Sequence, residues 1–195
     1  QFDRLMQTIR DYNPGADFPQ IEKAFHYASS LHSGQKRKDG SPFITHPLAV
    51  AQIVAEELHP DSESIVAALL HDCIEDTSAT YDNIAKEFSP TVADLVEGVS
   101  KLTRTHYTTK EEEQMENLRK MFMAMSKDMR VVLIKIADRL HNMRTMQYQT
   151  PEKQIKNCRE TMDIYAPLAH RLGMQKIKWE LEDIALRYLA PDSYN

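Results

Sequence analysis

A histidine–aspartate pair directly follows the most apolar stretch of the chain. Residues 65–70 are wholly apolar, and they lead into His71-Asp72-Cys73-Ile74-Glu75-Asp76. The apolar run predicts a buried helix whose apolar part ends at Leu70 and which runs directly into the polar residues. Glu75 and Asp76 come four residues after His71 and Asp72, so each lies one helical turn beyond its partner. One imidazole and three carboxylates at the end of a buried helix are unfavourable unless a cation offsets their charge.

Two further polar residues stand at the ends of other apolar segments. His46 precedes Pro47, which suits the first position of a helix because its missing N–H is not needed there. Asp138 follows residues 134–137, so we expect it at the inner end of a second apolar helix. Two imidazoles and two carboxylates could bind a divalent ion and leave positions open for water and substrate. The predicted ligands are His46, His71, Asp72 and Asp138.

Three longer motifs contain these residues: residues 37–47 (RKDGSPFITHP), 71–77 (HDCIEDT) and 136–145 (IADRLHNMRT). In this order they resemble the hydrolase domain of RelA/SpoT homologues, within the HD-domain phosphohydrolase superfamily, over essentially the whole chain. The resemblance implies an all-α HD-domain bundle of roughly nine to eleven helices. It also implies that residues 1–175 form the HD-type (p)ppGpp hydrolase domain. Residues 176–195 would begin the connection towards a synthetase domain that is absent here.

The activity implied by the resemblance is hydrolysis of the 3′-pyrophosphate of (p)ppGpp to GDP or GTP and pyrophosphate, with Mn²⁺ as the cofactor. Relatives that keep an acidic pair at the positions of Glu75 and Asp76 are competent for hydrolysis. Glu75, supported by Asp76, would take the proton of the attacking water. The residues expected to hold the nucleotide are Arg37 and Lys38, at the guanine and a nearby phosphate, together with Asn142 and Thr145. Asp39 departs from the serine common in this loop, and its carboxylate could weaken phosphate contacts.

Other interpretations remain open. The chain could hydrolyse another nucleotide, such as a 3′,5′-bisphosphate or a dNTP, or it could sense a nucleotide without turning it over. A purely structural helical domain would leave the convergent ligands unexplained. His141 is taken as structural because it is expected on a different helical face from Asp138, and Arg139 and Arg144 are expected to pair with acidic side chains. Cys73 has acidic neighbours, which oppose thiolate formation.

The elements that must position these residues are predicted to be helical almost throughout. Ser89-Pro90 and Thr150-Pro151 each place a capping side chain before a proline that suits a first helical position. Residues 130–136 are rich in β-branched side chains and could form a strand. Apolar residues continue at helical spacing beyond this segment, so we predict a helix. Residues 39–42 (DGSP) are typical of a turn.

Composition excludes several classes of protein. The 195 residues are 27% charged and 42% hydrophobic, as in ordinary globular domains. The 24 Lys and Arg against 29 Asp and Glu give a net charge of −5, which disfavours DNA binding. No apolar window reaches the ~18 residues of a membrane helix. Two cysteines suit a reducing compartment, and we expect a cytoplasmic protein. The N-terminus has neither a signal peptide nor a start methionine, so we expect a piece of a longer protein.

Overall fold

The computed structural model describes residues 1–103, 112, 115–116, 119–121, 123 and 127–190. Every regular element in these ranges is helical, and the one β-type contact among them is an isolated bridge between Lys36 and Pro42. This confirms the predicted all-α fold class. No helix in the described ranges is both long enough and apolar enough to cross a membrane.

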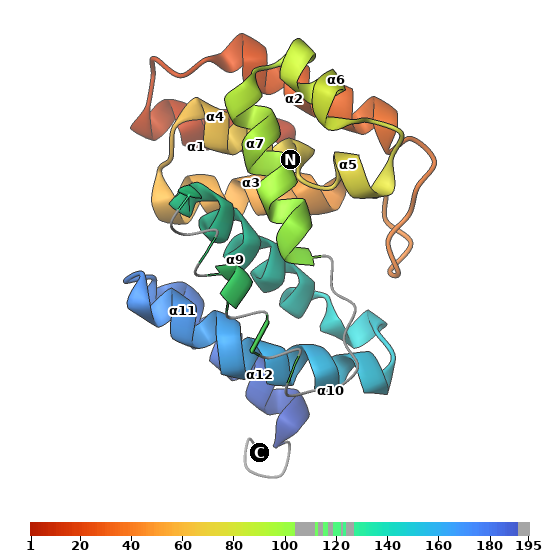
Figure 1. The fold of residues 1–195 in the computed structure, drawn as a ribbon, viewed down its shortest axis with the longest axis vertical. Helices are drawn as coiled ribbons and strands as arrows, with labels where there is room; N and C mark the ends of the chain where they lie inside the picture. Colours follow the sequence, from red (N-terminus) through yellow and green to blue (C-terminus); the bar gives the residue numbers. More distant parts are fainter. Residues whose placement is uncertain (104–111, 113–114, 117–118, 122, 124–126, 191–195) are drawn as a thin grey trace.

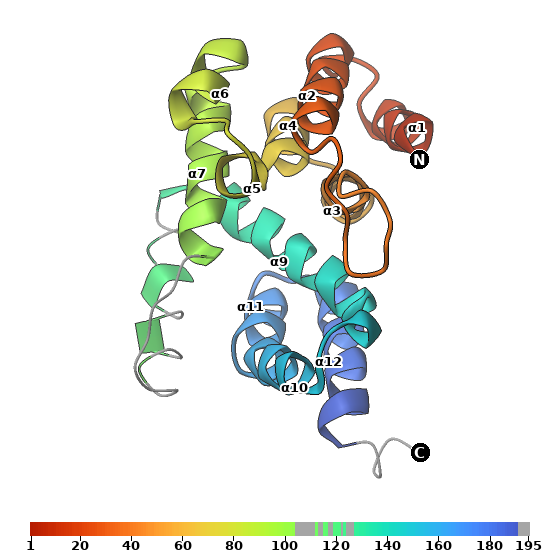
Figure 2. The same ribbon diagram turned by 90° about the vertical axis from the view of Figure 1, so that its right-hand side faces the viewer.

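The helices form two groups joined by one long helix (Figures 1 and 2). The first group is α1 (Phe2–Tyr12), α2 (Phe18–Leu31), α3 (Thr45–Leu58), α4 (Ser62–Leu70), α5 (Cys73–Asp76), α6 (Tyr81–Glu87) and α7 (Pro90–Thr103). The second group is η1 (Met146–Tyr148), α10 (Pro151–Glu160), the π-helix η2 (Thr161–Tyr165), α11 (Ala166–Arg171) and α12 (Gln175–Leu189). Between them α9 (Met129–Arg144) packs against α3 and α7 on one side and against α12 on the other.

The core of the first group is centred on α4. Residues 64–70 are all buried, because α2, α3 and α7 surround this helix. The side chain of Asp61 caps its first turn by accepting a hydrogen bond from the backbone N–H of Ser64. A helix that is apolar on every side is stable only when it is covered on every side. The backbone at its C-terminal end is therefore fixed by packing.

The predicted helix starts at two prolines are confirmed. Ser89 accepts a hydrogen bond from Val92 N at the start of α7, and Thr150 accepts one from Lys153 N at the start of α10. Residues 130–136, which are rich in β-branched side chains, are helical, as predicted. The side chain of Asp128 caps this helix by accepting a hydrogen bond from the backbone N–H of Arg130. The start of α3 differs from the prediction, because the helix begins at Thr45 and Pro47 is its third residue. A proline is tolerated there because the first four N–H groups of a helix have no intrahelical partner.

The predicted continuation of the apolar helix beyond Leu70 is wrong. His71 and Asp72 form a turn, and α5 begins at Cys73. Nδ1 of His71 lies 2.7 Å from the carbonyl oxygen of Ala68. That oxygen would accept the backbone N–H of Asp72 in a continuous helix. In the structure this oxygen instead contacts the imidazole of His71 and accepts the backbone N–H of His71, at the point where the helix ends.

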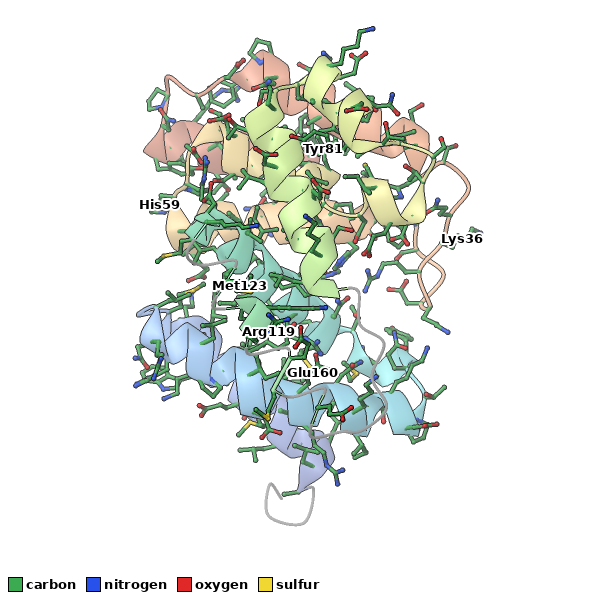
Figure 3. The ribbon with its side chains drawn as sticks, in the orientation of Figure 1. Lys36, His59, Tyr81, Arg119, Met123 and Glu160 are labelled. Atoms are coloured by element: carbon green, nitrogen blue, oxygen red, sulfur yellow. The ribbon has the colours of Figure 1, made fainter. Side chains whose placement is uncertain are left out.

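The loop between α2 and α3 projects at the edge of the first group, where Figure 3 labels Lys36. Its tip is the predicted turn: Gly40 has a φ of 88°, and its N–H donates to the carbonyl of Arg37. Asp39 Oδ1 accepts hydrogen bonds from N and Oγ of Ser41, at 2.9 and 2.6 Å. These hydrogen bonds lower the pKa of Asp39. Oδ1 of Asp39, which stands where serine is common, is therefore already hydrogen-bonded within its own turn.

Candidate metal centre

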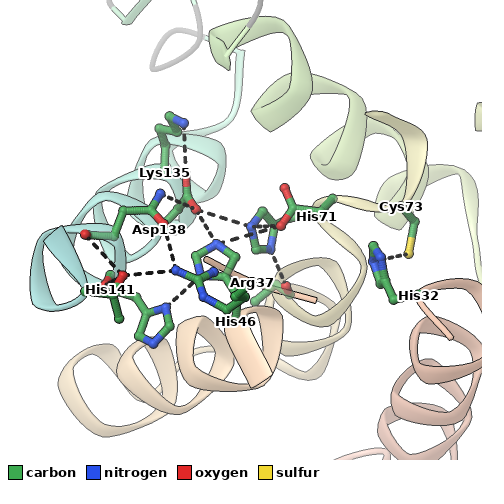
Figure 4. A network of polar contacts seen from close by, with 12 residues as sticks. His32, Arg37, His46, His71, Cys73, Lys135, Asp138 and His141 are labelled. Carbon is green, nitrogen blue, oxygen red and sulfur yellow. Dashed lines mark hydrogen bonds and ion pairs between the residues drawn. The ribbon is translucent and has the colours of Figure 1, made fainter. Parts of the chain in front are cut away.

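Three separate segments bring the four predicted ligands together. Figure 4 labels three of them, His46, His71 and Asp138. His46 comes from the first turn of α3, and His71 and Asp72 come from the turn between α4 and α5. Asp138 lies in the middle of α9 rather than at a helix end, which differs from the prediction. His46, His71 and Asp138 are buried, and Asp72 is half-buried.

The ligand atoms face one another. Nε2 of His46 lies 2.7 Å from Oδ1 of Asp138 and 3.7 Å from Oδ2 of Asp72. Nε2 of His71 lies 3.1 Å from the same Asp72 oxygen and 3.4 Å from the same Asp138 oxygen. Among the described residues, His46, His71 and Asp138 are the group of histidine, cysteine and acidic side chains close enough to share an ion. Asp72 adjoins this group through its two contacts with the histidines.

The donor set fits a cation. The contact between Nδ1 of His71 and the Ala68 carbonyl requires a proton on Nδ1, because a carbonyl can only accept. In the neutral ring Nε2 is then an acceptor, and this buried atom has no hydrogen-bond partner among the described residues. It faces two carboxylate oxygens, which are also acceptors. Only a positive charge placed among these atoms, either a proton or a metal ion, stabilises the arrangement.

The electrostatics of the centre agree with this reading. Burial alone would lower the pKa of His71, but Asp72 and Asp138 raise it well above its usual value. Burial would raise the pKa of Asp138, but Lys135 and His46 hold it well below its usual value. Asp138 is thus a carboxylate at neutral pH, as a metal ligand must be.

Lys135 and His141 touch the centre, and the sequence interpretation assigned a site role to neither. Nζ of Lys135 lies 2.9 Å from Oδ2 of Asp138, and Nδ1 of His141 lies 2.6 Å from Nδ1 of His46. The expectation that His141 lies on a different face from Asp138 is wrong, because residues three apart on a helix are neighbours. Two features of the sequence could have indicated these contacts: the spacing of three between Asp138 and His141, and the position of Lys135 within an apolar run. Burial, followed by His46 and Arg37, lowers the pKa of His141 to about 3.

The acidic pair lies beside the centre, on α5. Glu75 is half-buried, and its Oε1 accepts a hydrogen bond of 3.0 Å from Oγ of Ser100, a buried residue of α7. Asp76 is at the exposed end of α5, and its carbonyl accepts a hydrogen bond from Gln35 Nε2. Desolvation, followed by the charges of Asp72 and Glu75, raises the pKa of Asp76. The sequence offered no signal for Ser100, because its contact with Glu75 is purely tertiary.

The predicted substrate residues border the centre. Nη2 of Arg37 donates to Oγ1 of Thr145 at 3.0 Å and lies 3.5 Å from Oδ1 of Asn142. Nδ2 of Asn142 in turn donates to Oδ1 of Asp138, at 3.3 Å. Arg37, Lys38 and Thr145 line a cavity of about 250 Å³ together with Tyr148, an exposed aromatic side chain that the sequence interpretation missed. Asn142 therefore connects this cavity to the ligand cluster.

The expectations for three other residues are confirmed. Arg139 pairs with Glu160 and stacks over the ring of Tyr165, and Arg144 pairs with Glu180. Cys73 is buried, and its pKa is raised to about 12 by burial and then by Asp72 and Asp76. A thiol with this pKa is not a nucleophile at neutral pH.

Comparison with known proteins gives consistent matches. The HD domain family matches residues 24–175. The chain is 50% identical over 193 residues to the "Bifunctional (p)ppGpp synthase/hydrolase SpoT" of Escherichia coli strain K12, covering 99% of this chain and 27% of that protein. It is 52% identical over 194 residues to a "GTP pyrophosphokinase" of Streptomyces antibioticus, covering 98% and 23%. The chain thus spans about a quarter of the length of these relatives.

A solved structure also matches. It is described with the words "A metazoan ortholog of SpoT hydrolyzes ppGpp and plays a role in starvation responses". The two structures superpose with a TM-score of 0.70 at 27% sequence identity, over 88% of this chain and 96% of the other. Together these matches confirm the resemblance that the three motifs indicated.

Proposed function

The chain belongs to the HD-domain family, and we propose that it is a Mn²⁺-dependent hydrolase that removes the 3′-pyrophosphate of (p)ppGpp. The products are GDP or GTP and pyrophosphate. The observation that carries the proposal is the convergence of two imidazoles and two carboxylates beside a cavity lined by Arg37 and Lys38. The relatives that are named for this activity support it.

We assign the metal to His46, His71, Asp72 and Asp138. The geometry of these ligands would accept Mn²⁺, Fe²⁺, Co²⁺ or Zn²⁺, and the resemblance to RelA/SpoT homologues selects Mn²⁺. When bound, a divalent ion polarises a phosphate oxygen and makes a nearby water more acidic.

The residues of the chain perform the remaining tasks. Glu75, whose carboxylate Ser100 holds by a hydrogen bond, takes the proton from the attacking water. Asp76, with its raised pKa, supports Glu75 in this role. As the water oxygen bonds to the phosphorus attached to the ribose 3′ oxygen, the bond between that phosphorus and the 3′ oxygen breaks. Pyrophosphate leaves with the new oxygen, and the 3′ oxygen of GDP or GTP takes up a proton from solvent.

The nucleotide is held by residues around Arg37, which is linked to Asp138 through Asn142. The planar guanidinium of Arg37 stacks on the guanine, and Lys38 contacts a nearby phosphate. Asn142 and Thr145 contact the nucleotide, and both lie within reach of Arg37 in the structure.

We assign the hydrolase domain to residues 1–175 and the start of a connection towards a synthetase domain to residues 176–195. Several relatives carry the name GTP pyrophosphokinase. Because this chain spans only about a quarter of such relatives, we propose hydrolysis alone for it. We further propose that it acts in the cytoplasm.

The test is incubation of the purified chain with ppGpp, with Mn²⁺ or with a chelator, while pyrophosphate release is measured. We expect release with Mn²⁺ and none with the chelator. A dNTP and guanosine 3′,5′-bisphosphate serve as competing substrates, and faster turnover of either would identify a different nucleotide hydrolase. Saturable binding of ppGpp without turnover would identify a sensing module instead.

A further inference from the structure

The two imidazoles of the metal centre are held in different ways. Nδ1 of His71 donates to the carbonyl oxygen of Ala68 at 2.7 Å, so the backbone determines which nitrogen of this ring carries the proton. Among the described residues, Nδ1 of His46 has no such carbonyl partner. Its Nδ1 lies 2.6 Å from Nδ1 of His141 (Figure 4).

A contact between two imidazole nitrogens needs one proton between them, so one ring donates and the other accepts. Nε2 of His46 is the atom directed at the ligand cluster, 2.7 Å from Oδ1 of Asp138. To act as a ligand, Nε2 must carry no proton, which places the proton of the neutral ring on Nδ1. His141 must then be the acceptor.

We propose that His141 is a positioning residue for the metal centre. Its Nδ1 accepts the Nδ1–H of His46 and so fixes the tautomer and the rotation of that ring. This inference rests on the proposed function, because it concerns the same metal site. It assigns His141 a task for His46 that the Ala68 carbonyl performs for His71.

The surroundings of His46 leave this task to His141. The ring of His46 packs edge-on against His71 and Phe43, with centroid distances of 5.2 and 6.3 Å. These ring contacts do not distinguish a ring from the same ring turned by 180°. A turned ring would present a carbon to the ligand cluster. It would lose the contact of Nε2 with Asp138 and also the hydrogen bond of Nδ1 to His141, so His141 opposes that rotation from the Nδ1 side.

His141 is suited to the task by its place in α9. It follows Asp138 by three residues, so one helix carries both the carboxylate that contacts Nε2 of His46 and the imidazole that contacts Nδ1. The opposite edges of one ring are thus held by a single rigid element. His141 itself is not in the group of residues close enough to share the ion.

The experiment compares three variants by titration with Mn²⁺, using electron paramagnetic resonance to measure free Mn²⁺. His141→Leu removes the acceptor at similar volume, and His141→Asn keeps an acceptor oxygen near the position of Nδ1. His170→Leu is the matched control, because His170 is exposed on α11 and outside the centre. Circular dichroism and urea unfolding show whether each variant is folded.

We expect His141→Leu to weaken Mn²⁺ binding about 10- to 100-fold, the usual effect of removing a partner that orients a metal ligand. His141→Asn should keep most of the affinity, and His170→Leu should bind as the wild type does. Equal losses in the Leu and Asn variants would mean that His141 acts by packing, which overturns the proposal. Unchanged affinity in His141→Leu overturns it as well.

A measurement on the unaltered chain decides the question even if His141→Leu does not fold. Nuclear magnetic resonance of the ring nitrogens in the Zn²⁺-loaded chain should find the proton of His46 on Nδ1 and none on Nδ1 of His141. The opposite placement overturns the proposal. A wild-type chain that binds neither Mn²⁺ nor Zn²⁺ overturns the proposed function, whereas a chain that binds them with unaltered affinity in His141→Leu overturns this inference alone.

Discussion

Nζ of Lys135 and Oδ2 of Asp138 lie 2.9 Å apart, and both side chains are buried. The other carboxylate oxygen of Asp138 faces His46 and His71. One helix therefore supplies both a proposed ligand and the cation that keeps its carboxylate ionised. Burial lowers the pKa of Lys135, but Asp138 and Tyr165 raise it, and the net shift of this pKa is upward, so the lysine remains charged.

Replacement of Lys135 by methionine should destabilise the metal-free chain. Removing one partner of a buried ion pair costs about 3–5 kcal/mol, and we expect about 3 because His46 and His71 still contact Asp138. Urea unfolding in the presence of a chelator measures this loss. Lys101→Met is the matched control, since its pair with Glu97 is exposed and should contribute less than about 1 kcal/mol. Equal losses in the two variants would contradict the expectation.

Arg37→Ala should mainly raise KM for ppGpp. A guanidinium stacked on the base contributes to the ground state and the transition state alike, so kcat should change little. Arg37→Lys keeps the charge but loses the planar surface, and it should show most of the same rise in KM. Steady-state pyrophosphate release gives both constants. A fall in kcat with unchanged KM would place Arg37 in the chemical step instead.

The convergence of the four proposed ligands was predictable from the sequence, but their other contacts were not. Each of the four residues adjoins an apolar segment: His46, His71, Asp72 and Asp138. Because those segments are buried, the polar residues next to them lie in or near the core. Ser100 and Lys135 were not predicted as site residues because their roles depend on which helices become neighbours. His141 was misjudged, although its spacing of three from Asp138 was visible in the sequence.

The helical fold was also predictable, apart from the helix ends. Capping residues such as Ser89 and Thr150 act within one turn, so the sequence shows them directly. The break after Leu70 coincides with the contact between the imidazole of His71 and the carbonyl of Ala68. The position of that ring is set by tertiary packing, which no local pattern shows.

Gly98 of α7 lies against Val131 of α9, so the effect of Gly98→Ala on the free energy of unfolding should change sign with the residue at position 131. A Cβ at position 98 would lie 2.8 Å from Cγ2 of Val131, and overpacking of this kind costs about 1–3 kcal/mol. Against this, alanine is favoured over glycine within a helix by about 1 kcal/mol. Gly98→Ala should therefore lower the free energy of unfolding in the wild type but raise it in a Val131→Ala background. Destabilisation of equal size in both backgrounds would show that the contact is not the cause.

The two thiols should be unreactive in the folded chain. Burial raises the pKa of Cys73 to about 12 and that of Cys158 to about 11. At pH 8 a thiol of pKa 12 has about a thousandfold less thiolate than one of pKa 9, because each pKa unit is a factor of ten. Mass spectrometry after iodoacetamide treatment at pH 8 should find neither cysteine modified, and both modified in urea. Rapid alkylation of native Cys73 would contradict its raised pKa.

The final prediction separates catalysis from metal binding, through Glu75→Gln combined with Asp76→Asn. This double variant keeps the shape of both side chains and removes their charge and basicity. Loss of a general base costs about 10²- to 10⁴-fold, so turnover of ppGpp should fall by that much while Mn²⁺ remains bound. Glu182→Gln with Asp183→Asn is the matched control, because these neighbouring acids lie on α12 and pair with Lys178 and Arg187.

Pyrophosphate release and Mn²⁺ titration of the same samples distinguish the outcomes. Turnover within a few-fold of the wild type would mean that another group takes the proton, and the role assigned to Glu75 would be wrong. Loss of both turnover and Mn²⁺ binding would mean that Glu75 and Asp76 stabilise the metal centre rather than take part in proton transfer. Loss of turnover with retained Mn²⁺, and an unaffected control, would agree with the geometry: Ser100 holds the Glu75 carboxylate by a hydrogen bond, and the group proposed to bind the metal consists of other residues.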